Sequence, residues 1–503
     1  MKIISTKFFK VRYLLTILLL FFSSNLFYAQ HRGDNLSFQA LYCSNDIGAK
    51  AIAMGGAYTS MSGGVTSLFY NPAGLMGIDH FQITMSANYS SYLWRESQEY
   101  RPNRMFVTLP FYLEGIYLPD IANNGKLDSY LVDSTQYDVS SVVMGKDPYS
   151  RAAANWQKIK ANAKINNIAI AAPFKLFNRD FVVSVGYNLQ YNVQDYDQNN
   201  SYLVPYIGDY LYGYLPPANG QDTEVVKWYK FIREISGNIY NGSAALAYQV
   251  TDYLNVGVKA KIILGQTDDE LYLNRIGDFH LINQNKFQFW YVTDNNLTQG
   301  TSKYTGVNYS LGAILKLNSF NLGINIDLPY TLERKWNYTT THSDTNGSSS
   351  VYSNGIDKFE YPAIFSFGVN FEPHEKFIFS LDYQVAPFSK ATFQLASLDT
   401  TFRKWVNQSS LRLGVEFKMS KFIAVLVGYN TISQPFVPDG AAITDRGPFS
   451  ESYNAGFSFN IFGGNLDLTY EIRMLKYYDQ YLSNTNYKYQ SLNNFVFGYT
   501  YGL

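Results

Sequence analysis

Residues 377–385 read FIFSLDYQV and alternate with a period of two. Large apolar side chains occupy every second position, namely Phe377, Phe379, Leu381, Tyr383 and Val385, and Ser380, Asp382 and Gln384 lie between them. Successive side chains of a β-strand point to opposite faces of the sheet. The stretch therefore predicts a strand with one apolar face and one polar face.

The same alternation recurs along most of the chain. It predicts an all-β protein of fourteen strands, at residues 81–92, 164–176, 181–193, 236–250, 253–264, 307–317, 320–328, 365–371, 377–385, 411–417, 423–429, 453–459, 466–472 and 493–503. A further candidate at 105–117 contains Pro110, which a central strand tolerates poorly, so we place it in a loop. The last strand alternates up to Leu503, which suits pairing with the first strand to close a barrel.

Such two-faced strands occur both in soluble sandwiches and in membrane barrels, and periodicity alone does not separate the two. Aromatic residues make up 17% of the 503 residues, with 44 Tyr and 36 Phe. Tyr is typical of the girdles at which a barrel meets the lipid–water boundary. Together with the leader described below, this composition favours a transmembrane antiparallel β-barrel in contact with outer-membrane lipid.

The first residues have the order of a secretory signal. Lys2, Lys7, Lys10 and Arg12 precede a short apolar run at 14–22, and a cleavage site is predicted after Ala29. We expect residues 1–29 to be removed on export to the outer membrane of a Gram-negative cell. The alternative is a membrane anchor, but the apolar run is shorter than the ~20 residues that cross a bilayer as a helix.

The predicted connections alternate between short and long. The long ones are residues 94–163, 194–235, 266–306 and 332–361, and all fall on the same side of the predicted barrel. Outer-membrane barrels have short periplasmic turns and long external loops. We therefore expect a barrel over residues 80–503 with these four segments outside the cell, and assembly by the barrel-assembly machinery.

Residues 48–75 read GAKAIAMGGAYTSMSGGVTSLFYNPAGL and match neither a helical nor a strand period. Small residues before the first strand suggest that 30–79 fold back into the lumen as a hatch. The stretches MGGAY at 54–58 and LFYNPAGL at 68–75 resemble the FadL/TodX family of outer-membrane transporters for long-chain fatty acids and other hydrophobic compounds. Later stretches, including YPA at 361–363, also resemble it.

The resemblance implies a fourteen-stranded barrel with an N-terminal hatch, capture of substrate at the outer loops, and sideways exit through an opening in the wall. It places Asn71, Pro72, Ala73 and Gly74 of the hatch near that opening, beside a kink in the third strand at Gly186. The other interpretation of Pro72 and Gly74 is a simple turn before the first strand.

A fatty acid needs apolar walls for its tail and a cation for its carboxylate. The inward-facing candidates on the strands are Lys259, Lys261, Arg412 and Arg473, and their alternative role is pairing with Asp382, Glu416, Asp467 and Glu471 in a polar barrel interior. Tyrosines of the outer segments, among them Tyr206, Tyr210 and Tyr212, are capture candidates or girdle residues.

Enzymatic and nucleic-acid-binding roles find no support in the sequence. The five His residues are scattered, no nucleophile motif is present, and Cys43 is the only cysteine. The formal net charge is zero, so we expect no nucleic-acid partner, and we expect no metal and no cofactor. Two alternatives to a transporter stay open: a scaffold for protein secretion, similar to PorV-like barrels, and a general porin.

Overall fold

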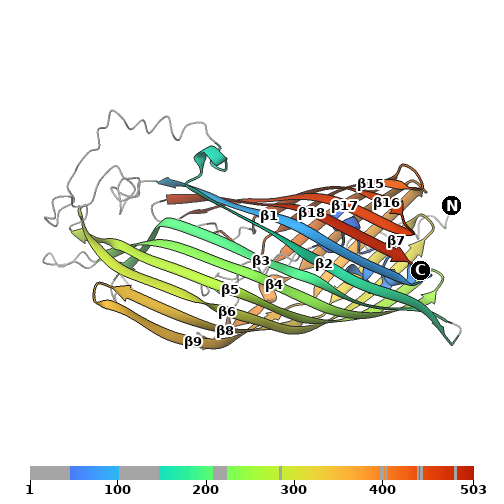
Figure 1. Cartoon of the computed structure of the whole chain (residues 1–503), viewed down its shortest axis with the longest axis horizontal. Coiled ribbons are helices and arrows are strands. Elements are labelled where there is room, and N and C mark those ends of the chain that lie inside the picture. Colours follow the sequence, from blue (N-terminus) through green and yellow to red (C-terminus); the bar gives the residue numbers. More distant parts are fainter. Residues whose placement is uncertain are drawn as a thin grey trace, which may run out of the picture.

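The computed structural model describes residues 46–100, 147–177, 179–207, 224–282, 286–396, 401–402, 405–438, 441, 446–480 and 484–503. These residues form a closed antiparallel barrel of fourteen strands, as predicted (Figure 1). The leader, Cys43 and the candidate at 105–117 lie outside the described residues. Among the residues described, no helix has the length and apolarity to cross a membrane.

Each strand of the barrel pairs with its neighbours along the chain, and β1 pairs with β18 from Gln82↔Gly502 to Tyr100↔Asn484, which closes the barrel. The strands are β1 (Gln82–Tyr100), β2 (Trp156–Leu176), β3 (Arg179–Ile207), β4 (Glu224–Thr251), β5 (Leu254–Ile282), β6 (Lys286–Leu317), β7 (Phe320–Asp327), β8 (Tyr330–Asp344), β9 (Gly347–Tyr361), β10 (Ile364–His374), β11 (Phe377–Ala386), β12 (Thr392–Gln394), β13 (Thr401–Phe402), β14 (Gln408–Lys418), β15 (Ile423–Ser433), β16 (Phe449–Ile461), β17 (Gly464–Gln480) and β18 (Asn484–Gly502).

Four of these segments extend the fourteen strands rather than add to them. β7 and β8 both pair with β6 and are separated only at Leu328 and Pro329. β9 and β10 are likewise interrupted at Pro362, whose lack of an N–H prevents a ladder hydrogen bond. β12 and β13 form a short hairpin whose β12 pairs with β9.

The alternation along the strands sorts side chains as expected for a membrane barrel. On β5, Val258, Ile262 and Leu264 are exposed on the outer surface, whereas Lys259 and Ile263 are buried on the luminal side. Lipid covers an exposed apolar belt of this kind, and the polar face lines the lumen. The fold therefore matches the prediction from periodicity.

The predicted loop boundaries need correction, because the strands continue far beyond the predicted membrane segments. Most of 194–235 belongs to β3 and β4, most of 266–306 to β5 and β6, and nearly all of 332–361 to the β8–β9 hairpin. Of 94–163, β1 takes the residues up to Tyr100 and β2 those from Trp156. On the outer part of β8 the outward side chains are polar, for example Thr339 and Thr341, so the apolar stripe that marks a strand in the sequence is lost there.

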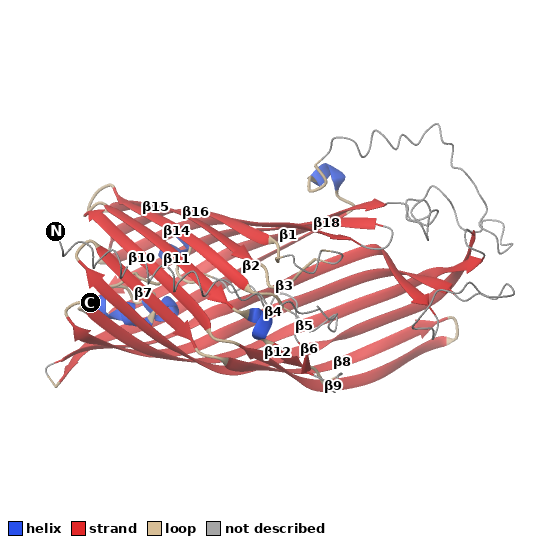
Figure 2. Cartoon of the chain, turned by 180° about the vertical axis from the view of Figure 1, so that it is seen from behind, coloured by secondary structure: helices blue, strands red, loops and turns tan. Residues whose placement is uncertain are grey.

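Residues 46–80, which we call the luminal segment, lie inside the barrel (Figure 2). The segment contains the helices α2 (Ala49–Ala53) and α3 (Ser67–Tyr70) and the 3₁₀ helix η1 (Pro72–Gly77); two other 3₁₀ turns lie at η2 (Arg151–Ala153) and η3 (Phe388–Lys390). Glycines on the wall admit it: a Cβ on Gly428 of β15 would lie 2.0 Å from the Gly55 nitrogen. Gly55 itself has a φ of 65°, a conformation that favours glycine.

Candidate functional site

Buried charges of the wall hold the luminal segment in place. One oxygen of Asp382 on β11 accepts hydrogen bonds from the backbone N–H groups of Tyr58 and Thr59, each at 2.8 Å. Lys50 of α2 forms an ion pair of 2.9 Å with Glu416 on β14. Charged partners strengthen such hydrogen bonds. The wall therefore holds the luminal segment at two places, at Lys50 within α2 and at Tyr58 and Thr59 just after it.

The motif Asn71–Pro72–Ala73 lies against β5, β6 and β7. The Asn71 side chain accepts a hydrogen bond from the Ala73 N–H at 3.1 Å, which caps η1, and donates to the carbonyls of Thr59, Ala313 and Ile324 at 2.8–3.3 Å. Gly312 of β6 leaves room for it, because a Cβ there would lie 2.0 Å from the Asn71 Oδ1 atom. Gly74 packs against the Met61 carbonyl.

The third strand is irregular, but the irregularity is not at Gly186. Gly186 pairs regularly with Ala169 of β2 and Ser243 of β4, and its open side faces Leu68 of α3. The register of β3 shifts instead between Leu189 and Tyr191. The bulge therefore lies at Gln190, four residues beyond Gly186, where no glycine marks it in the sequence. The kink at Gly186 stays a prediction.

A gap in backbone pairing starts at the same level. The β2–β3 ladder ends at Asn167↔Asn188, although β2 extends back to Trp156 and β3 on to Ile207. We call these two edges, 156–166 of β2 and 189–207 of β3, the seam; the two strands run apart there in Figure 1. Asn71 and Pro72 pack on β5–β7, and their place near the opening stays a prediction.

Side chains close the seam, and they show that its edges overlap. Lys160 and Lys164 of β2 alternate with the exposed Ile159 and Ile165 and so face the lumen. Lys160 nevertheless pairs at 2.6 Å with Glu234 of β4, a residue on the same face of β4 as the exposed Leu246. The outward face of β3–β4 therefore lies against the luminal face of β2 at this level.

Further contacts cross the same overlap. Lys164 donates to Asn192 of β3 at 2.6 Å and to Asn238 of β4. The ring of Trp156 meets that of Tyr196 edge-on at 5.5 Å. No backbone hydrogen bond joins the two edges within the described residues, so side-chain contacts alone hold this part of the wall.

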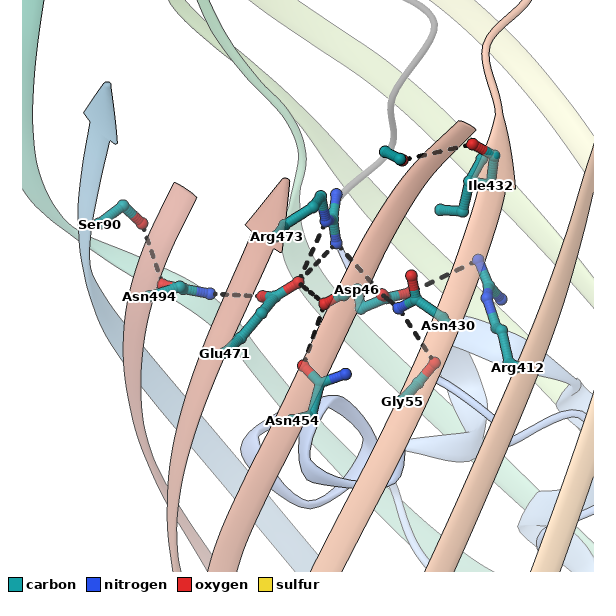
Figure 3. A network of polar contacts seen from close by, with 12 residues as sticks. Asp46, Gly55, Ser90, Arg412, Asn430, Ile432, Asn454, Glu471, Arg473 and Asn494 are labelled. Carbon is teal, nitrogen blue, oxygen red and sulfur yellow. Dashed lines mark hydrogen bonds and ion pairs between the residues drawn. The ribbon is translucent and has the colours of Figure 1, made fainter. Parts of the chain in front are cut away.

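Arg412 of β14 and Arg473 of β17 both face Asp46, the first described residue of the luminal segment (Figure 3). Each guanidinium lies 3.5 Å from an Asp46 oxygen, and Arg473 also pairs with Glu471 at 2.8 Å. Asn430 joins the group by donating to Asp46 Oδ2 at 3.5 Å, and it also donates to the Gly55 carbonyl at 3.3 Å. The pairing predicted as the alternative role thus occurs at Arg473, and Asp46 was missed as its second acid.

The two lysine candidates also have partners within the protein. Lys259 is 3% exposed and donates to the Phe69 carbonyl of α3 at 3.2 Å. Lys261 pairs with Asp327 of β7 at 3.2 Å. Tyr210 and Tyr212 lie outside the described residues, and of Tyr206 only its place in β3 is described.

An apolar cluster that the sequence did not reveal lies inside the barrel, between the luminal segment and the outer end. We call it the aromatic layer; its buried members are Tyr191, Val193, Ile235, Ile239, Ile263, Tyr304, Leu332, Tyr338, Phe359, Tyr361, Ala386, Phe388, Ala391, Phe393, Leu395 and Trp405. They come from β3, β4, β5, β6, β8, β9, the end of β11 and the segment between β11 and β14. The layer therefore runs from the seam strand β3 across to the opposite wall.

A buried polar group is embedded in this layer. Arg334 of β8 is 2% exposed and pairs with Asp357 of β9 through its Nε at 2.8 Å. Asp357 also accepts from the Trp336 indole at 3.1 Å. Burial raises the pKa of Tyr338, which lies on the outer extension of β8, so this phenol stays protonated and donates to Asp269 at 2.9 Å.

The signal that could have revealed the layer is a change on the luminal face. In the C-terminal strands the luminal positions carry Asp, Glu, Arg or small residues, whereas on β3, β4 and β8 beyond the membrane they carry Val193, Ile235, Ile239 and Leu332.

Among the residues described, no group of three or more His, Cys, Asp or Glu side chains is placed to hold a metal ion.

Comparison with solved structures finds the same barrel fold in other proteins. A FadL homologue of Pseudomonas aeruginosa aligns over 92% of this chain and 98% of its own, with a TM-score of 0.58 and 12% identity. The Pseudomonas putida toluene transporter TodX aligns over 91% and 98%, with a TM-score of 0.53 and 12% identity. The monoaromatic hydrocarbon channel CymD aligns over 91% of this chain and 97% of its own, with a TM-score of 0.50 and 12% identity. No protein-family model and no curated protein sequence matches the chain. The chain therefore shares the FadL-type fold.

Proposed function

We propose that this protein is an outer-membrane transporter that takes up hydrophobic compounds by passive diffusion. The observation that carries the proposal is the aromatic layer, which is buried in the lumen and reaches the seam through Tyr191 and Val193. Sites for apolar molecules are lined mainly by apolar and aromatic side chains. The shared fold with a toluene transporter and a FadL homologue supports the same conclusion.

We infer a route that starts at the outer end of the barrel, passes the aromatic layer and leaves sideways through the seam into the outer membrane. The luminal segment would act as the hatch that closes the direct path along the barrel axis. The seam is suited to a lateral exit because opening it breaks side-chain contacts only, whereas opening any fully paired neighbour would break a ladder of backbone hydrogen bonds.

The most direct substrate class to test is long-chain fatty acids. The four predicted cations all contact groups of the protein, at Asp46, Glu471, Asp327 or the Phe69 carbonyl. A carboxylate substrate therefore has to compete with an internal partner, whereas an uncharged hydrocarbon needs none. For this reason oleate and toluene belong in the same experiment.

The test is entry into liposomes that contain the purified protein, compared with empty liposomes. We expect oleate or toluene to enter faster with the protein present, while ion conductance in planar bilayers stays low because the luminal segment fills the barrel. Equal entry with and without protein would overturn the transport proposal. High conductance would favour the general porin, and a stable co-purifying protein without bound lipid would favour the secretion scaffold.

A further inference from the structure

The segment Pro387–Ala396, which we call the strap, follows β11 at the outer end of the barrel and contributes part of the aromatic layer. It contains η3 and β12, and its buried apolar residues are Phe388, Ala391, Phe393 and Leu395. In Figure 2, β12 lies beside β9 on the outer side of β10 and β11. β11 ends at Ala386, and beyond it the strap pairs with β9 and adds apolar side chains to the layer.

Aromatic contacts show how closely the strap fills this position. Phe393 is 0% exposed, and its ring meets those of Trp405 and Phe359 edge-on, at centroid distances of 4.8 and 5.9 Å. Phe388 meets Tyr361 edge-on at 5.9 Å. Edge-to-face geometry is the arrangement that aromatic pairs prefer. The phenyl ring of Phe393 therefore occupies a site that suits a ring of that size.

The backbone attachment of the strap is slight by comparison with the strands around it. β12 pairs with β9 over three residues, from Thr392↔Glu360 to Gln394↔Lys358. Within the described residues, β12 also pairs with β13 over two residues, and the Ser389 N–H donates to Asn407 Oδ1 at 3.2 Å. The Ala396 N–H donates to Asp357 at 2.8 Å, and Asp357 is held by Arg334. The neighbouring β8 and β9 pair along their whole length, from Tyr330↔Tyr361 to Asp344↔Gly347. The backbone bonds that opening would break are therefore few, and buried apolar side chains such as Phe388 and Phe393 account for most of what holds the strap.

We propose that the strap is an outer gate, and that Phe393 occupies the position that an apolar, ring-sized part of the substrate takes when the strap separates from β9. This inference rests on the proposed transport function. Closed, the strap completes the aromatic layer and shields it from outside. Open, it exposes Phe359 and Trp405 as the walls of an apolar site that leads toward the seam.

A reversible lock on the strap tests this. Thr392 and Glu360 are directly opposed and hydrogen-bonded through their side chains on the outer surface, so T392C with E360C, in a C43S background, places two cysteines at opposed positions of an antiparallel pair. The matched control is T341C with S350C, a hydrogen-bonded pair at 3.0 Å on the β8–β9 hairpin that does not touch the strap.

We expect oxidation of the strap pair to reduce toluene entry into liposomes to the rate of empty liposomes, and reduction to restore it. Oxidation of the control pair should leave entry unchanged. Equal entry before and after oxidation of the strap pair, at a rate above that of empty liposomes, would overturn the gate while leaving transport intact. Entry at the empty-liposome rate in both states would instead overturn the transport function itself, and the gate with it.

A second variant addresses the role of Phe393. F393A removes the ring but keeps the strap and its backbone bonds to β9. We expect toluene entry to rise about tenfold, the factor that corresponds to about 1.4 kcal/mol less closing energy. The conservative variant F393L should lie between F393A and the unchanged protein. If F393A lowers the melting temperature without changing entry, Phe393 is only part of the structural core, and its role as the gate's occupant is refuted.

Discussion

Asp382 offers the sharpest test of how the barrel holds its luminal segment. Its carboxylate is 2% exposed and accepts both the Tyr58 and the Thr59 N–H at 2.8 Å. Replacement by Ala leaves two buried donors without an acceptor. Hydrogen bonds to a charged group contribute about 1.5–3 kcal/mol each. The second Asp382 oxygen has no hydrogen-bond partner within the described residues. Its burial is therefore unfavourable, and removing it offsets part of the stability lost with the two hydrogen bonds.

We therefore expect D382A to destabilise the luminal segment around Tyr58 by about 3 kcal/mol, which is about a 150-fold change in the population of the opened segment. D382N keeps an acceptor oxygen but loses the charge, so its effect should be about 1 kcal/mol, roughly fivefold. The assay is hydrogen exchange of the Tyr58 and Thr59 amides in detergent, which reports local opening directly.

The matched control is L381A, since Leu381 directly precedes Asp382 on β11 and faces the lipid with 43% exposure. It should leave the exchange of both amides unchanged. If D382A accelerates their exchange by less than about threefold, the two hydrogen bonds do not anchor the segment, and the reasoning from burial and charge fails.

Three further perturbations test other parts of the molecule. E234Q removes the ion pair with Lys160 across the seam, so we expect faster substrate entry. Because ions at about 0.5 M screen the pair in the unchanged protein, its entry rate should depend on salt between about 50 and 500 mM, and that of E234Q should depend on salt less. D46N weakens the contacts of both arginines with the luminal segment, so hydrogen exchange should rise around residue 47. Burial raises the pKa of Glu96, on the outer extension of β1, from 4.5 to about 7 although Lys488 lies 3.4 Å away. A raised carboxyl pKa means that the folded state holds the proton more tightly, so stability should fall as the pH rises from 4.5 to about 7, and E96Q should flatten the pH profile of the melting temperature.

Each of these three outcomes has a clear contrary. Equal salt dependence in E234Q and the unchanged protein would show that the ion pair does not latch the seam. Unchanged hydrogen exchange in D46N would show that Arg412 and Arg473 do not hold the luminal segment in place. For Glu96, a melting temperature that rises between pH 4.5 and 7, or a profile that E96Q does not alter, would contradict the proton-holding role.

The alternation of side chains made the barrel predictable, because a period of two on a lipid-facing strand is a local property of the chain. Phe379 and Leu381 of β11 lie outward and Asp382 lies inward, as the opening stretch predicts. The strand ends were less predictable. Beyond the membrane both faces of β8 meet water or protein, so Thr339 and Thr341 carry no apolar signal although their strand continues.

The residues of the candidate site were predictable only in type. Inward-facing cations follow from the alternation, but their partners depend on which strands face each other across the lumen. Asp46 meets Arg412 and Arg473 over more than 360 residues of chain, a pairing that no local pattern encodes. The same holds for Asn71, whose side chain reaches carbonyls of β6 and β7.

By itself, then, the sequence determined the all-β class, the strand number, the lipid-facing surface and the small-residue segment inside the barrel, because each follows from periodicity or composition within a short stretch. Only the tertiary structure decided where the wall is held by side chains alone, at the overlap of β2 with β3 and β4, and that Phe393 and Tyr361 join one apolar layer. Those features depend on closure, since the barrel brings together residues that are distant in the chain and fixes which faces overlap.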